Sequence, residues 1–157
     1  MSSTTFITNE QLLQHWLAHR NLTRKTIEQF PEKELFEFSI GGMRPFADLI
    51  KEFFAIDVPG LKGFVTGEMD AYTHDATLNN KEAILKKWDD NTPKIIEYFN
   101  QITEEKLNEK FSLFGQYANT IRNHILYFID NEIHHRAQGF VYLRALNIEP
   151  PFFWDRY

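Results

Sequence analysis

The sequence contains no cysteine, which excludes disulfide bonds, a cysteine-ligated zinc site and a thiol nucleophile. It has no run of about 18 uncharged apolar residues, so we expect no membrane-spanning helix. There is no cluster of basic residues and the net charge is −5, so a nucleic-acid partner is not expected. The glycines match no phosphate-binding loop, and no serine lies in a nucleophile-elbow pattern. These absences exclude several common classes of enzyme and binding protein.

The overall composition instead favours a globular protein with a filled core. Apolar residues make up 43% of the chain and aromatic residues 15%, including 15 phenylalanines. A length of 157 residues suits one domain spanning residues 1–157, and we find no internal repeat. The first residues lack the basic and hydrophobic segments of a secretory signal, so we expect a cytoplasmic protein.

Apolar residues recur at helical spacing in four long stretches, which predict helices at about residues 9–29, 45–65, 81–102 and 119–147. Pro59 predicts a break or kink in the second helix, and Pro93 predicts a kink or a split at Asn91-Thr92 in the third. Residues 1–8 are expected to fray. The connectors are expected to be irregular, with a short extended segment at 107–114 as one alternative. The sequence therefore predicts an all-α fold, an antiparallel four-helix bundle.

The last predicted helix carries the clearest candidate site. Asn131 and His135 lie one turn apart on one face, the spacing by which a helix presents two ligands to one ion. The second predicted helix offers the carboxylate of Glu52, with Asp48 one turn earlier. Two interpretations remain open: these side chains bind a metal ion, or they form a hydrogen-bonded polar cluster.

The other histidines give weaker signals. His124 shares the face of His135, but about 16 Å of helix axis separates them, so we predict a buried, hydrogen-bonded residue or a pocket wall. His15 and His19 lie one turn apart in the first helix without a third ligand, so we predict surface residues. His134 is expected to face a neighbouring helix or solvent.

Two segments resemble a known family. The stretch Glu132-Ile-His-His-Arg-Ala-Gln138, followed by Tyr142-Leu-Arg144 and Asn147-Ile-Glu-Pro-Pro151, is similar to the C-terminal signature of the DinB-like superfamily of damage-inducible and related metal-binding four-helix bundles. The stretch from Gly42 to Leu49 resembles the entry to that family's second helix. The resemblance implies an up-down-down-up bundle, often dimeric. It also implies a divalent ion, commonly zinc or nickel, held by one histidine of the second helix and two of the fourth.

Carried over residue by residue, the family's ligand positions fall on Glu52, Asn131 and His135, so two of the three histidines are replaced. A carboxylate prefers harder ions than imidazole does, and an amide oxygen is a weak, neutral ligand. Zinc or nickel would therefore bind much less tightly than to three histidines. The resemblance leaves open a bound divalent ion, such as zinc, nickel or manganese, and an ion-free cluster in which Glu52 pairs with the other two residues.

Two functional hypotheses follow. The first is a metal-dependent hydrolase or thiol transferase, acting on an unknown small molecule at an altered or degraded site between the second and fourth helices. The second is a non-catalytic, stress-associated homodimer without a metal, whose interface uses the phenylalanine-rich helices and the aromatic tail Phe152-Phe-Trp-Asp-Arg-Tyr157. The tail is expected to dock on the bundle or on a partner because it is too apolar to be left in water. Neither hypothesis includes a nucleic-acid or membrane partner.

Overall fold

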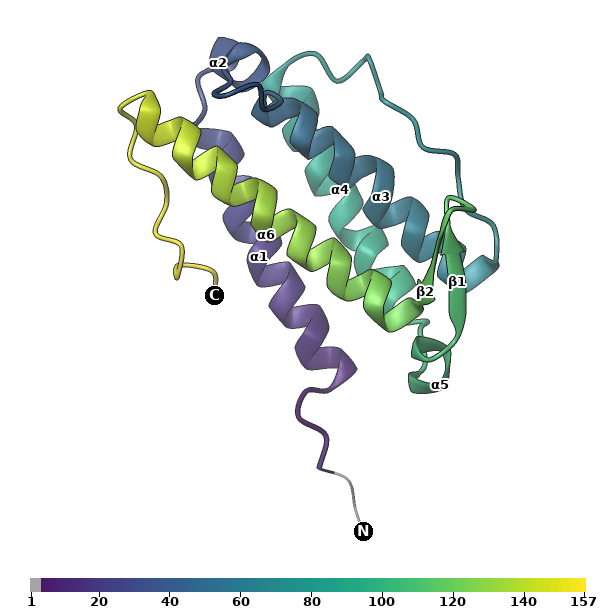
Figure 1. Ribbon diagram of the computed structural model, residues 1–157. Helices are drawn as coiled ribbons and strands as arrows, with labels where there is room; N and C mark the ends of the chain where they lie inside the picture. Colours follow the sequence, from purple (N-terminus) through teal and green to yellow (C-terminus); the bar gives the residue numbers. More distant parts are fainter. Residues whose placement is uncertain (1–3) are drawn as a thin grey trace.

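Figure 1 shows the computed structural model of the protein, which describes residues 4–157. Its four long helices are α1 (Asn9–Gln29), α3 (Phe46–Thr66), α4 (Lys81–Phe99) and α6 (Ile121–Ala145). Helices α1 and α3 each pack against both α4 and α6, which gives the order α1, α4, α3, α6 around the bundle. Helices α1 and α6 run in one direction and α3 and α4 in the other (Figure 1). The predicted all-α fold, an up-down-down-up bundle, is confirmed.

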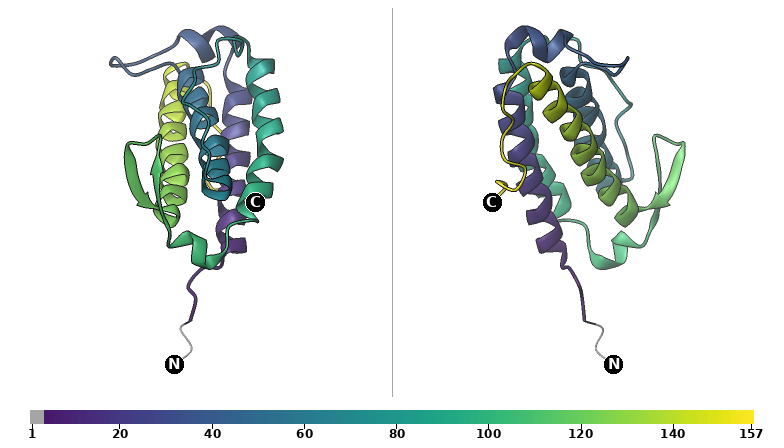
Figure 2. Two further views of the ribbon diagram at one scale, coloured as in Figure 1. Left: turned by 90° about the vertical axis from the view of Figure 1, so that its right-hand side faces the viewer. Right: turned by 60° about the vertical axis from the view of Figure 1, so that its left-hand side comes forward.

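The connectors account for this topology. The short helix α2 (Glu32–Glu37) leads from α1 towards α3. Residues 67–80 form a long loop that runs back along the outside of the bundle, which is why α3 and α4 are parallel (Figures 1 and 2). Helix α5 (Glu104–Leu107) and the antiparallel hairpin β1 (Lys110–Leu113) and β2 (Tyr117–Thr120) lead into α6. Within residues 4–157 no helix has the length and apolar character needed to cross a membrane.

Three of the four long helices begin at side-chain caps. Thr8 caps α1 by a reciprocal pair of hydrogen bonds with Gln11, at 2.9 and 3.1 Å. Asn80 caps α4, and Thr120 caps α6. The last helix therefore begins at Ile121, two residues after its predicted start, because residues 119 and 120 belong to β2.

The two internal prolines do not interrupt their helices: α3 continues through Pro59 and α4 through Pro93. The predicted break in α3 and the predicted split at residues 91–92 are therefore wrong. A proline inside a helix costs roughly 3 kcal/mol. The helical turns beyond each proline bury Leu61 and Phe64 in α3, and Ile95 and Phe99 in α4. Burial of these large side chains outweighs the local cost.

Other local expectations were partly wrong. The connector after α1 contains the helix α2, which buries Leu35 completely. The extended segment expected near 107–114 is β1, and its partner β2 was not predicted. Residues 4–8 are outside any helix or strand, as expected, while residues 1–3 lie outside the described part of the chain.

The core consists of two apolar clusters, one around Trp16 and Phe128 and one around Phe46 and Trp88. Helix α6 approaches α3 closely at Gly139, where an added Cβ would lie 2.6 Å from the Phe46 ring. Polar side chains are also buried: His19, Arg20, Thr23, Thr26, Asp57, Asn91, His124, Glu132, His135 and Arg136. Several of these buried polar groups belong to the clusters described below.

The C-terminal tail lies along α1. The Lys25 ammonium is 3.1 Å from the Asp155 carboxylate, and the Asn21 amide donates a hydrogen bond of 3.2 Å to the Arg156 carbonyl oxygen. The predicted docking on the bundle is therefore confirmed, but it uses polar groups. The aromatic rings of the tail remain largely exposed to solvent.

Candidate functional site

Glu52, Asn131 and His135 lie together between α3 and α6, as their helical positions predict. The Asn131 amide nitrogen donates a hydrogen bond of 3.1 Å to Glu52 Oε1, and His135 Nε2 lies 3.4 Å from the same oxygen. The Glu52 side chain is 15% exposed and that of His135 11%, so both are largely removed from water. Their role as metal ligands stays a prediction.

A fourth group, Arg44, completes this cluster. Arg44 lies just before α3, and its guanidinium is 2.7 Å from Glu52 Oε2. On the other side, His135 Nδ1 lies 2.6 Å from Gln138 Oε1. The hydrogen bond from His135, reinforced by those from Arg44 and Asn131 and opposed by burial, lowers the pKa of Glu52 to about 2. Glu52 is therefore ionised at neutral pH. We call Arg44, Glu52, Asn131 and His135 the Glu52 cluster.

As arranged, the Glu52 cluster does not fit a divalent cation. A guanidinium already occupies one oxygen of Glu52, and Asn131 turns its amide N–H group, a donor, towards the other. A metal ion needs acceptor atoms from each ligand, and a neighbouring positive charge repels it. Across residues 4–157, no three His, Cys, Asp or Glu side chains converge closely enough to hold an ion.

The sequence matches a known protein family over nearly its full length. The sequence profile of the DinB family matches residues 1–154. The chain belongs to the DinB family. Among curated proteins, it is 24% identical to the uncharacterized protein YjoA of Bacillus subtilis, over 94% of this chain and 97% of that one.

Solved structures of the DinB family agree. The crystal structure of the DinB-like protein YjoA from Bacillus subtilis matches with a TM-score of 0.70 at 25% identity, covering 94% of this chain and 99% of that chain. A DinB-like protein from Bacillus cereus matches with a TM-score of 0.76 at 15% identity, covering 96% and 100%, and supports the fold alone.

Beside Glu52, this DinB-family chain has a pocket of about 720 Å³. Its walls come from α3, the 67–80 loop, the β-hairpin and α6. They include four aromatic residues, and the Tyr72 and Phe114 rings pack edge to face at 5.6 Å. Periodicity could not reveal this pocket, because one wall is a hairpin that the sequence did not predict.

A second polar cluster, missed by the sequence analysis, lies between α6 and α1. Glu132 is fully buried and accepts hydrogen bonds from Thr23 Oγ1 at 2.7 Å and Trp16 Nε1 at 3.2 Å. One turn later, Arg136 donates to the His19 carbonyl oxygen at 3.1 Å and lies 3.0 Å from His19 Nδ1. The i, i+4 spacing of Glu132 and Arg136 was a usable signal. Only the structure shows that this face of α6 meets α1.

Arg20 forms a third buried polar contact, between α1, α3 and α4. It donates a hydrogen bond of 3.2 Å to the Trp88 carbonyl oxygen, and its guanidinium lies 4.0 Å from the Trp88 ring centroid. The carboxylate of Asp57 is 3.6 Å away. Burial raises the pKa of Asp57 well above its ordinary value, although Arg20 opposes this.

The remaining histidines differ in outcome. His124 is buried, hydrogen-bonded to the Phe111 carbonyl oxygen at 2.9 Å and part of the pocket wall, so both of its predicted roles are confirmed. His134 is exposed, as predicted. The prediction that His19 is a surface residue is wrong: it is 5% exposed, because the α1–α6 contact covers it.

Proposed function

We propose that this DinB-family protein binds a small molecule without a metal ion, and that the Glu52 cluster takes the structural place of the ion. The proposal rests on the contact of 2.7 Å between Arg44 and Glu52 Oε2. This pair neutralises the carboxylate that would otherwise attract a cation. The hydrogen bond from Asn131 and the neighbouring His135 then tie α3 to α6, as a shared ion would.

The pocket beside Glu52 supports a binding role. Its volume of about 720 Å³ lies within the usual range for small-molecule sites. The aromatic side chains in its wall are Tyr72, Phe114, Tyr117 and Tyr127. Such walls suit an apolar or aromatic molecule. Because Arg44 neutralises Glu52, we expect the preferred ligand to be uncharged.

Dye binding tests this proposal. After dialysis against a chelator, the protein is expected to bind the uncharged apolar dye Nile red, followed by fluorescence. The dissociation constant should be the same with and without zinc, nickel or manganese, because the Glu52 cluster has no free ligand positions. Dye binding that requires an ion, or a thermal midpoint that rises with one, would contradict metal independence.

Three variants serve as controls. Ala118 lines the pocket and Ala137 is exposed on α6. Ala118→Trp should therefore abolish dye binding and Ala137→Trp should not. Dye binding that survives Ala118→Trp would place the ligand elsewhere. The double variant Glu52→His with Asn131→His restores histidine at all three family positions, so its thermal midpoint should rise by several degrees with zinc or nickel.

The alternative is a metal-dependent hydrolase or thiol transferase. The meeting of Glu52, Asn131 and His135 at one point between α3 and α6 favours it. In that case Arg44 must leave Glu52, and Asn131 must turn its oxygen towards the ion. An ion bound to these three side chains would supply a Lewis acid that lowers the pKa of a bound thiol or water. A metal-dependent rise in the thermal midpoint of the unaltered protein would favour this alternative.

We further propose that the protein is a homodimer joined through its aromatic tail. The exposed fractions are 56% for Phe152, 59% for Phe153, 66% for Trp154 and 85% for Tyr157. Such a group of aromatic side chains is typical of a protein–protein interface. In sedimentation at micromolar concentration, the unaltered chain should have twice the mass of one chain. Phe153→Ser with Trp154→Ser should give a monomer, whereas Leu126→Ser, on the exposed side of α6, should not. A monomeric unaltered chain would contradict the dimer.

A further inference from the structure

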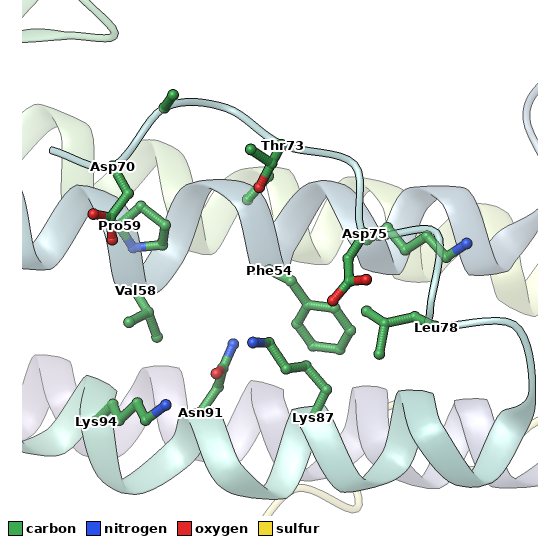
Figure 3. Close-up of a pocket in the computed structure, with 13 residues that line it drawn as sticks. Phe54, Val58, Pro59, Asp70, Thr73, Asp75, Leu78, Lys87, Asn91 and Lys94 are labelled. Atoms are coloured by element: carbon green, nitrogen blue, oxygen red, sulfur yellow. The ribbon is translucent and has the colours of Figure 1, made fainter.

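A second cavity, of about 410 Å³, lies between α3, α4 and the loop 67–80. It shares no lining residue with the pocket beside Glu52. Figure 3 shows the loop running alongside α3 through Thr73 and Asp75 and turning towards α4 at Leu78. Phe54 and Val58 of α3 and Leu78 supply apolar wall. The cavity therefore has an apolar side and a wall contributed by the loop.

The α4 side of this cavity is basic. Lys87, Asn91 and Lys94 follow one another at i, i+4 and i+7, so they share one face of α4, and all three line the cavity. Figure 3 shows the amide of Asn91 and the ammonium group of Lys87 within the gap between α4 and α3. Lys51 of α3 also lines the cavity, but its ammonium group lies over the Phe36 ring, 5.7 Å from the ring centroid. Lys87 and Lys94 thus make the α4 wall of this small volume basic.

The carboxylates of the cavity are engaged with other partners. Asp70 pairs with Lys62 at 2.8 Å. Asp75 accepts hydrogen bonds of 2.9 and 2.6 Å from the backbone N–H and hydroxyl of Thr77. Within residues 4–157, the salt bridges include none from Lys51, Lys87 or Lys94, whereas the neighbouring Lys86 pairs with Asp90 on the outside of α4. Asp75 still interacts electrostatically with Lys87 and Lys51, but no carboxylate within residues 4–157 forms a salt bridge with Lys87 or Lys94, so an anion can contact both ammonium groups.

Asn91 supplies an independent indication of a ligand. It is only 3% exposed and points into the cavity. The side-chain hydrogen bonds near it on α4 belong to Arg20 and Thr92, and its own amide has no partner in the described chain. Among residues 4–157 its amide atoms are not among the solvent-inaccessible atoms that lack a partner, so they are open to the cavity, where a bound ligand can hydrogen-bond them.

We propose that this cavity is a binding site for a small organic anion. Lys87 and Lys94 contact its phosphate or carboxylate group, and the Asn91 amide N–H donates a hydrogen bond to the same group. The apolar part of the ligand packs against Phe54 and Val58. Residues of the loop 67–80 form the remaining wall of the site.

Calorimetric titration of the intact protein tests the site with phenyl phosphate, benzoate and uncharged benzyl alcohol as probes. At least one anion should bind with a dissociation constant of about 1 mM or lower, and benzyl alcohol should bind at least tenfold more weakly. Tighter binding of phenyl phosphate than of benzoate would assign the site to phosphates, and the reverse to carboxylates. No heat from either anion up to about 10 mM would overturn the proposal.

Matched variants connect binding to these residues. Lys87→Gln and Lys94→Gln should each weaken the bound anion roughly tenfold, whereas Lys86→Gln should leave affinity unchanged. Asn91→Leu removes the unpartnered amide, so it should abolish binding while keeping or raising the thermal midpoint. A purely structural Asn91 would instead lower the midpoint. Equal losses for Lys86→Gln and Lys87→Gln, or unchanged binding in Asn91→Leu, would overturn the assignment. None of these variants touches the pocket beside Glu52, so this test is independent of the proposed function.

Discussion

Replacement of Glu132 by alanine is expected to lower the free energy of unfolding by roughly 2–6 kcal/mol, because two buried donors lose their acceptor at about 1–3 kcal/mol each, and because the buried guanidinium groups of Arg20 and Arg136 lose a favourable negative charge. Glu132 is fully buried on α6, and burial raises its pKa above the ordinary value, against the influence of Arg20 and Arg136. Its removal also leaves the donors Thr23 Oγ1 and Trp16 Nε1 without their acceptor. Each unsatisfied buried group adds its own cost.

Urea unfolding at neutral pH measures this effect, and two variants delimit its cause. Asp130→Ala, an exposed acidic residue of the same helix, should change stability by no more than about 0.5 kcal/mol. Glu132→Gln should recover only part of the loss. Its amide keeps one oxygen acceptor for Thr23, but it lacks the charge and turns an N–H group towards the Trp16 donor. A loss below about 1 kcal/mol in Glu132→Ala would show that the α1–α6 contact does not depend on this carboxylate.

Both polar clusters on α6 come from one short stretch of sequence. Asn131 and His135 are one turn apart and face α3, while Glu132 and Arg136 are one turn apart and face α1. A rotation of about 100° per residue separates the two pairs. The segment that resembles the family signature therefore joins α6 to both of its neighbours through hydrogen bonds, one pair to each side.

The sequence predicted what depends on a single helix and missed what depends on how helices meet. Period and capping residues located the four long helices, and the i, i+4 spacing with the family resemblance located Glu52, Asn131 and His135. The role of Arg44 was not predictable, because it lies outside the periodic part of α3 and reaches Glu52 only in the folded chain. His19 was assigned to the surface because helical spacing does not show which face a neighbouring helix covers.

The two internal prolines show that packing between helices can also override a strong local signal. Pro59 and Pro93 are strong local signals for the end of a helix, yet α3 and α4 continue through them. The local rule accounts for one missing hydrogen bond and one steric contact. It contains no term for the apolar side chains that the following turns bury against other helices, and in this bundle that burial decides the outcome.

The stability of the protein is expected to fall as the pH decreases below 6.5 because of His19. Burial is the main cause, with the positive charges of Arg136, His15 and Arg156 adding to it, and together they lower the pKa of His19 from 6.5 to about 3. Between these values the unfolded chain binds a proton that the folded chain does not. The free energy of unfolding therefore falls with decreasing pH, by up to about 1.4 kcal/mol per pH unit.

Unfolding in denaturant at pH 7 and pH 5 isolates this effect. The unaltered chain should lose about 2 kcal/mol more between these values than His19→Asn does. Asparagine cannot titrate, yet its amide oxygen can replace Nδ1 as the acceptor for Arg136. Glu52 does not contribute to the change between pH 7 and pH 5, because its pKa is lowered from 4.5 to about 2. The stability that Glu52 contributes is fully present above about pH 4.5 and is lost only as the pH falls towards 2. Equal losses in the two proteins would mean that the folded chain protonates His19 as readily as the unfolded chain does, and that Arg136 does not hold it neutral.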